Sequence, residues 1–140
     1  MSKKSSNQSG FSLVEIILAI SVFALSVLGL SGGLIYGSQS NIAAANRVQA
    51  TFLSSEGLEA VENIAEENFD NLVDGSTGLT VENNSYILTG NSDTYDIYER
   101  QITILSVDAN TKEVTSRVSW SQGVMDEGEV TLSTYITDWK

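Results

Sequence analysis

The sequence predicts an α+β fold in which a long N-terminal α-helix, membrane-spanning in its first half, packs on a small antiparallel β-sheet. Three observations predict it. Residues Phe11–Tyr36 form an apolar run whose only charged residue is Glu15. Apolar residues then recur at helical spacing, and after them the chain changes to alternating strand patterns separated by Gly-, Asn- and Asp-rich turns. In 140 residues this pattern leaves one modest core outside the apolar run.

The apolar run is long enough to cross a bilayer, which takes about 20 helical residues. Lys3 and Lys4 precede it, so the positive-inside rule predicts a cytoplasmic N-terminus and an extracytoplasmic remainder. A secretory signal is one alternative, but its apolar region has about 7–15 residues, and the nearest Ala-x-Ala-like site, Ala43–Ala45, lies well past the run. A plain signal anchor is another, and it does not explain the carboxylate inside the run.

The junction between the polar leader and the apolar run reads GFSLVE over residues Gly10–Glu15. This stretch, with the basic leader before it and the apolar helix after it, resembles the processing motif of type IV prepilins. The resemblance covers residues 1 to about 30. It implies a type IV pilin-like protein that a prepilin peptidase cleaves after Gly10 and N-methylates on the new terminus, Phe11. The apolar helix then stays on the mature chain.

Cleavage would create a positively charged amine on Phe11 at the end of an apolar helix. In a filament of packed helices an unpaired buried amine is costly, and a carboxylate of a neighbouring subunit removes that cost by pairing with it. We therefore interpret Glu15 as an assembly residue that pairs with Phe11 of an adjacent subunit. Glu15 also lies near the start of its own helix, where negative charge is favourable. The alternative is that the Glu15 side chain extends to the lipid headgroups.

Residues 37–72 are predicted to continue the helix as an amphipathic segment, to about Asn68. Its proposed core-facing stripe consists of Leu58, Val61, Ala65, Phe69 and Leu72. Val48 and Phe52 are expected to extend this stripe towards the N-terminus. Glu59, Glu62, Glu66 and Asp70 line an adjacent face that we expect to be solvated. The glycines between residues 29 and 37 predict either a soft spot that bends on assembly or a close approach of neighbouring helices.

Residues 73–140 are predicted to form a loop region and an antiparallel sheet. The loop region contains two short strands, Leu79–Glu82 and Tyr86–Thr89. Three longer strands follow, at Tyr95–Val107, Glu113–Ser121 and Glu129–Thr137. Leu105 and Val107 have the opposite parity to Ile102 and Ile104, which predicts a bulge or a first strand covered on both faces. Trp120 is expected to anchor the core.

Composition excludes several functions. The chain has no Cys and no His, so thiolate or imidazole chemistry is impossible. The seven basic residues are scattered in a chain of net charge −11, so no direct nucleic-acid binding is predicted. Asp126, Glu127 and Glu129 cluster, but their spacing does not match a calcium loop. No catalytic constellation is visible, so we expect neither an enzyme nor a cofactor.

The sequence therefore predicts a type IV pilus-like filament subunit with a leader at residues 1–10 and a membrane and filament-core helix at residues 11–36. Its expected partners are the prepilin peptidase, other pilin subunits and, before assembly, inner-membrane lipid. A minor pilin is favoured by the small sheet, the absence of a cysteine-closed loop and the segment TFLSSEGLEAVENI. The alternatives are a pseudopilin of a type II secretion or competence system, and a signal-anchored extracytoplasmic binding domain.

Overall fold

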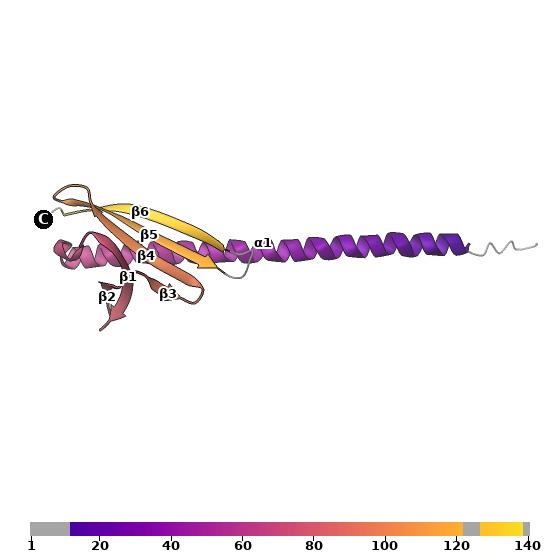
Figure 1. The fold of residues 1–140 in the computed structure, drawn as a ribbon, viewed down its shortest axis with the longest axis horizontal. Helices are drawn as coiled ribbons and strands as arrows, with labels where there is room; N and C mark the ends of the chain where they lie inside the picture. The colour runs from indigo at the N-terminus through magenta and orange to yellow at the C-terminus, as the bar shows by residue number, and fades with distance from the viewer. Residues whose placement is uncertain (1–11, 122–126, 139–140) are drawn as a thin grey trace, which may run out of the picture. The chain divides into compact units, whose positions relative to one another are not determined.

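The computed structural model of the chain describes residues 12–121 and 127–138 (Figure 1). These residues form one long helix, α1 (Leu13–Glu67), and a short 3-10 helix, η1 (Phe69–Asn71). Six strands follow: β1 (Gly75–Glu82), β2 (Ser85–Thr89), β3 (Asp93–Tyr95), β4 (Tyr98–Ser106), β5 (Thr111–Ser121) and β6 (Glu127–Thr137). The structure confirms the predicted α+β class, because a long apolar N-terminal helix is followed by an antiparallel sheet that packs on its C-terminal part.

The chain divides by its internal contacts into two units, residues 1–41 and 42–140, and each is described by itself. In the first unit the glycine-containing segment, residues 29–37, is helical. A Cβ atom built on any of its four glycines would meet nothing within 4 Å. The two predictions for this segment, bending and close helix approach, concern the assembled protein and stay predictions.

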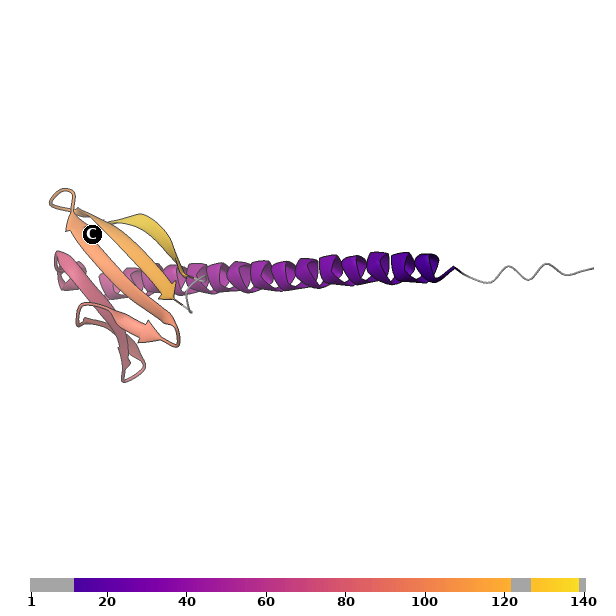
Figure 2. The same cartoon turned by 45° about the vertical axis from the view of Figure 1, so that its right-hand side comes forward.

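In the second unit the strands follow the order β2-β1-β4-β5-β6, and every pair is antiparallel. β3 shares one edge of β4 with β1: β1 pairs with Ile102–Ile104, and β3 pairs with Tyr98–Arg100. Figure 2 shows β4, β5 and β6 lying side by side. The chain turns between β4 and β5, where the N–H of Val107 donates to the carbonyl of Thr111 at 2.9 Å.

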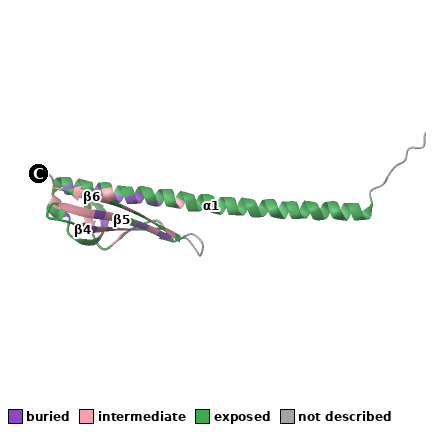
Figure 3. Ribbon diagram, turned by 90° about the horizontal axis from the view of Figure 1, so that it is seen from above, coloured by how far each residue is buried: buried purple, intermediate pink, exposed green. Residues whose placement is uncertain are grey.

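Alternation along β4 and β5 places every second side chain against α1. One buried cluster joins Ala60, Val61, Ile64 and Ala65 of α1 to Ile102, Ile104 and Val114 of the sheet, with Leu72 and Leu79 beside them. A second cluster joins Ala50 and Leu53 of α1 to Tyr98, Val118 and Trp120, which confirms Trp120 as a core residue. Figure 3 shows buried residues along the stretch of α1 that covers the sheet. The core therefore lies between the C-terminal part of α1 and one face of the sheet.

The first long strand differs from its prediction. The chain turns after Tyr95, where Asp96 has a positive φ of 56°, and this turn divides the predicted strand into β3 and β4. No bulge forms in β4, because its register with β5 is regular as far as Ser106 opposite Lys112. Leu105 instead points to the face of the sheet away from α1 and is 52% exposed.

The prediction that Val48 and Phe52 extend the core stripe is wrong. Val48 is 55% exposed and Phe52 is 67% exposed. A helix turns about 100° per residue, so the six positions from Phe52 to Leu58 leave Phe52 about 120° away from the direction of Leu58. Leu53 and Gly57 face the sheet in this region, and both are buried.

Candidate processing and assembly segment

The first part of α1 is an exposed apolar surface. Its large apolar side chains from Leu13 to Tyr36 are 44–76% exposed. The helix is long and apolar enough to cross a membrane. No residue of its most apolar 18-residue stretch is buried in the described structure. Burial of this surface in lipid or against other helices would be strongly favourable, at about 25 cal/mol per Å² of apolar surface. Such a helix is suited to membrane anchoring and to helix packing.

Glu15 lies in the first turn of this helix. The carbonyl of Ser12 accepts hydrogen bonds from the N–H groups of Glu15, at 2.9 Å, and of Ile16, at 3.2 Å, so the helical hydrogen bonding starts at this point. The first N–H groups of a helix have no intrahelical partners, and a negative charge beside them is favourable. Glu15 is the only charged residue between Leu13 and Asn46.

The three predicted site residues are not all described. Gly10 and Phe11 lie outside the described residues, and the structure places only Glu15. Its carboxylate is exposed at the beginning of an apolar helix, where it is available to a cation of another molecule. Its neighbours are the apolar residues Leu13, Val14, Ile16 and Ile17, so this position suits ion pairing in an apolar environment rather than catalysis.

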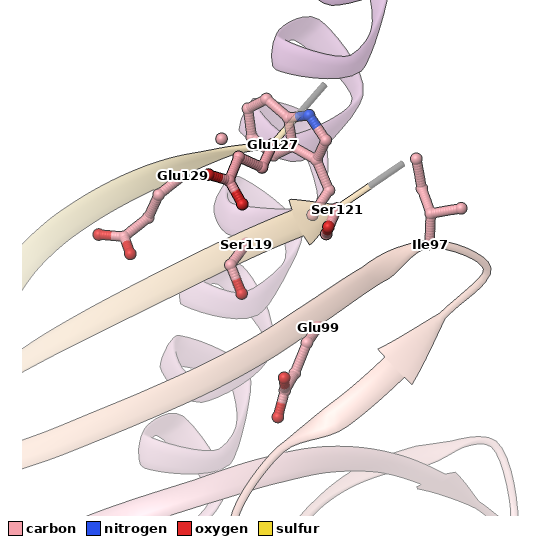
Figure 4. Close-up of a pocket in the computed structure, with 8 residues that line it drawn as sticks. Ile97, Glu99, Ser119, Ser121, Glu127 and Glu129 are labelled. Atoms are coloured by element: carbon pink, nitrogen blue, oxygen red, sulfur yellow. The ribbon is translucent and has the colours of Figure 1, made fainter. Parts of the chain in front are cut away.

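The acidic residues Glu127 and Glu129 of the predicted cluster lie at the start of β6, at one end of the sheet. A hollow of about 510 Å³ is lined there by Glu99, Ser119, Ser121, Glu127 and Glu129, together with Ile97 and other residues (Figure 4). Pairing across β4, β5 and β6 brings these groups together, since Ser119 lies opposite Glu99 on one side and Glu129 on the other. Asp126, the third acid of the predicted cluster, lies outside the described residues.

Two of the three carboxylates that line this hollow, those of Glu99 and Glu129, have partners within the chain. Glu99 accepts a hydrogen bond from Ser92 Oγ at 2.7 Å, and Glu129 accepts one from Arg117 Nε at 2.6 Å. The hydrogen bond from Arg117 lowers the pKa of the Glu129 carboxyl. Within residues 12–121 and 127–138, no group of three or more acidic, His or Cys side chains is arranged to hold a metal ion. The hollow is therefore an acidic surface with internal ion pairing.

Comparison with known families identifies the N-terminal segment. Residues 5–31 match the family model described as the prokaryotic N-terminal methylation motif. The match contains Gly10, Phe11 and Glu15, and it confirms the resemblance to type IV pilin-like proteins. No curated protein and no solved structure matches the chain significantly. The motif and the apolar helix together make the N-terminal part of the chain similar to that of membrane-anchored proteins of the pilin or pseudopilin type, which are structural subunits.

Proposed function

We propose that this chain is a subunit of a type IV pilus-like filament. A prepilin peptidase cleaves it after Gly10 and N-methylates Phe11. The mature chain keeps the apolar part of α1, anchors through it in the inner membrane with the N-terminus cytoplasmic, and then enters the filament through the same helix. The observation that carries the proposal is the methylation motif at residues 5–31, placed directly at the start of an exposed apolar helix.

The geometry around Glu15 supports the assembly step. A subunit that leaves the membrane for a filament exchanges lipid contacts for contacts with other apolar helices. Hydrophobic burial alone does not select one register between two such helices, because it has no direction. An ion pair between Glu15 and the methylated amine of a neighbouring Phe11 supplies that register, because an unpaired buried charge costs about 3–5 kcal/mol.

Analysis of the mature N-terminus tests the proposal. The full chain is isolated from its native host, and its intact mass and N-terminal sequence are determined. We expect the mature chain to begin at an N-methylated Phe11. A membrane-bound form that retains the residues before Phe11 would instead support a signal-anchored binding domain, and a terminus beyond Tyr36 would support ordinary secretion.

Within this proposal we favour a minor pilin over a pseudopilin. The support is the small globular part, a sheet of six short to medium strands, and a chain without any cysteine-closed loop. Quantitative mass spectrometry of sheared surface filaments separates the two. A minor pilin is present there at a small fraction of the main subunit, whereas a pseudopilin is absent from surface filaments and enriched with a secretion or competence complex.

A further inference from the structure

β6 is the last strand of the sheet, and no strand within residues 12–121 and 127–138 pairs with its second edge (Figure 1). It pairs with β5 over all 11 of its residues without a bulge. A long, regular edge strand is open to pairing with a further chain, and proteins usually protect such edges with lysine, proline, a bulge or a short strand. β6 contains no lysine and no proline, and it carries no charge from Val130 to Thr137. Its second edge, which we call the open edge, is therefore suited to pairing with a further strand.

The backbone hydrogen-bonding groups of β6 alternate between its two edges. Directly after the strand, the N–H of Asp138 donates to the carbonyl of Asn110 at 2.8 Å, in the register that also places Ile136 opposite Lys112. Hydrogen-bonded positions recur at every second residue of an antiparallel pair, so the even-numbered residues of β6 bond to β5. The N–H and C=O groups of the odd-numbered residues therefore point to the open edge. These residues are Glu127, Glu129, Thr131, Ser133, Tyr135 and Thr137, and all are exposed.

The face of β6 that is turned towards α1 is covered only in part. Val130, Leu132 and Ile136 lie on this face and are half-buried, whereas the middle of the same face of β5 is fully buried. Beside Ile136, a hollow of about 520 Å³ opens between β6 and the end of the helical segment, and its lining includes Ala65 and Phe69. A strand added to the open edge would place every second side chain over this apolar surface. The surface therefore favours a strand with apolar residues at alternate positions.

The charges at both ends of the open edge are negative. Glu127 begins β6, and Glu62 lines the hollow at the other end of the strand. No ion pair joins either carboxylate to another residue in the described ranges. A second copy of this chain is poorly matched to them, because its net charge is −11 and three of the four basic residues in the described ranges, Arg100, Lys112 and Arg117, are already paired internally. Charge complementarity therefore favours a different, basic partner.

We propose that the open edge of β6 binds an extended segment of another protein as an added antiparallel strand, with apolar residues at alternate positions and Lys or Arg near both ends. Backbone hydrogen bonds to the odd-numbered residues of β6 supply affinity, and the apolar side chains cover the half-buried face. The basic ends pair with Glu62 and Glu127 and select the partner. The contact goes beyond the proposed function, since it requires neither processing at Gly10 nor assembly of a filament.

Binding of synthetic peptides to the full-length, detergent-solubilised chain tests the contact. The first peptide, KTVTLTVTK, is fluorescently labelled, and its length of about 30 Å as a strand is close to that of β6. When its valines and leucine face α1, the N–H groups of its threonines point to β6, because opposite residues of an antiparallel pair share a face. N-methylation of the threonines should therefore abolish binding, whereas N-methylation of the valines and leucine should preserve it. The acidic peptide ETVTLTVTE should bind at least about tenfold more weakly than the basic one. Fluorescence anisotropy measures each affinity.

Substitutions in the full-length chain locate the contact. Ser133→Pro removes one N–H from the middle of the open edge and keeps the hydrogen bonds to β5, and proline is tolerated at such positions of edge strands. It should weaken binding of KTVTLTVTK by at least about tenfold, since the ring also blocks close approach of the added strand. Ser133→Ala is the matched control, because it keeps the N–H, and it should bind as the natural chain does. Circular dichroism establishes that the proline variant is folded.

A charge substitution provides a second test that does not alter the backbone. Glu62→Lys should weaken binding of KTVTLTVTK and strengthen binding of ETVTLTVTE, each by about threefold or more, because it reverses the charge at one end of the open edge. The matched control is Glu82→Lys, since Glu82 is an exposed carboxylate at the end of β1, and it should change neither affinity. If the proline variant does not fold, the comparison of Glu62→Lys with Glu82→Lys decides.

Four outcomes would overturn the proposal. Equal binding of the two N-methylated peptides would exclude strand addition, and unchanged binding to folded Ser133→Pro would exclude the edge of β6. Equal binding of the basic and acidic peptides, or equal effects of Glu62→Lys and Glu82→Lys, would reject selection by charge. Self-association of the natural chain that Ser133→Pro abolishes would show that a second copy occupies the edge. The proposed function is decided separately, because none of these measurements depends on the mature N-terminus at Phe11.

Discussion

The guanidinium of Arg100 on β4 forms a bidentate ion pair with the carboxylate of Asp93 on β3. Its Nε donates to Asp93 Oδ1 at 3.2 Å, and its Nη2 donates to Asp93 Oδ2 at 2.8 Å. Nη1 of the same guanidinium donates to the carbonyl of Leu53 on α1 at 3.1 Å. Asp93 Oδ1 also accepts the N–H of Leu79 on β1 at 2.9 Å. One buried arginine thus ties β3 and α1 to β4, and its carboxylate partner adds β1.

Removing the carboxylate of this pair should destabilise the fold strongly. Arg100 is only 9% exposed, so Asp93→Ala would leave a buried cation that has lost its main partner. Glu56 Oε2 lies 3.6 Å from Nη1 and compensates only in part. We expect Asp93→Ala to lower the free energy of unfolding by about 3 kcal/mol. Denaturant unfolding of the detergent-solubilised chain, followed by circular dichroism, measures it.

The control for this prediction is the Arg117–Glu129 pair. Both of its side chains are about half exposed, and such surface pairs contribute little to stability. Glu129→Ala should therefore leave the unfolding midpoint close to that of the natural chain. Equal losses for Asp93→Ala and Glu129→Ala would show that burial of Arg100 does not decide the energetics.

Gly57 allows α1 to approach the sheet closely. A Cβ atom at this position would lie 2.7 Å from Ser116 Oγ and 3.2 Å from Arg100 Cδ, both on neighbouring strands. Alanine in a helix gains about 1 kcal/mol over glycine, but overpacking a tight contact costs about 1–3 kcal/mol. We expect Gly57→Ala to lower the free energy of unfolding by about 1 kcal/mol, measured by the same denaturation. A stabilised variant would show that the contact can relax freely.

Substitution of Ser116 by alanine should stabilise the fold, unlike substitution of Gly57 by alanine. Its backbone carbonyl accepts a hydrogen bond from Ser54 Oγ at 2.8 Å, but its own buried Oγ has no partner among the described residues. A buried hydroxyl without a partner costs about 1–3 kcal/mol. Ser116→Ala should therefore raise the free energy of unfolding by about 1 kcal/mol and also relieve most of the penalty of Gly57→Ala. A double-mutant cycle of the two substitutions measures this coupling, and additive effects would contradict the close contact.

Local patterns account for the features that the sequence predicted correctly. The GFSLVE junction is a contiguous motif, and the alternation of Val114, Val118 and Trp120 is visible within one strand. Both signals are complete over a few neighbouring residues. The long helix and the strand pattern of β5 could therefore be predicted without knowledge of how the elements pair.

The remaining features depend on contacts between distant segments. Arg100 and Ser116 are polar residues that normally lie at a surface, and only the packing of α1 on β4 and β5 buries them. Gly57 carries no sign in the sequence that a strand lies against it. The four-residue spacing from Val48 to Phe52 resembles that of the stripe and wrongly predicts Phe52 on the core side, because the helical phase turns Phe52 away from the sheet. Predicting which residues are buried therefore requires the helical phase over more than one turn and the identity of the packing partner, and a local sequence pattern supplies neither.

Asp74 should contribute an acid-sensitive part of the stability. Its carboxylate accepts hydrogen bonds from Ser106 Oγ at 2.7 Å, from Lys112 Nζ at 3.0 Å and from the N–H of Ser106 at 3.1 Å. The Ser106 hydroxyl, then Lys112, lower the pKa of the Asp74 carboxyl below its ordinary value of 3.8. A lowered folded-state pKa stabilises the fold above pH 3.8, and this contribution is lost as the pH falls below that value.

Comparison of the natural chain with Asp74→Asn tests whether the ionised Asp74 carboxylate stabilises the fold at neutral pH. The asparagine variant should be less stable at pH 7, and the difference between the two unfolding midpoints should shrink as the pH falls below about 4. Urea denaturation from pH 7 to pH 2.5 measures this difference. A difference that stays constant over this range would mean that the asparagine loses hydrogen bonds without any contribution from the ionised carboxylate.

Glu15→Ala should separate processing from assembly. The substitution leaves Gly10 and Phe11 in place, so we expect cleavage and N-methylation to continue at the natural level. Assembly should fall more than about tenfold, because a methylated amine without its carboxylate partner costs several kcal/mol in an apolar filament core, and about 1.4 kcal/mol corresponds to each tenfold change. Intact-mass analysis of the membrane fraction measures processing, and immunoblotting of sheared filaments measures assembly.

Glu15→Gln distinguishes the charge of this side chain from its size and polarity. If Glu15 acts by pairing with the amine of a neighbouring Phe11, the neutral glutamine should fail nearly as badly as alanine. If the side chain only extends to the lipid headgroups, an amide reaches them as well as a carboxylate does, and both variants should assemble normally. Assembly of Glu15→Gln at the natural level would therefore reject the pairing role, while a methylated Phe11 in the same preparation would leave the filament-subunit proposal intact.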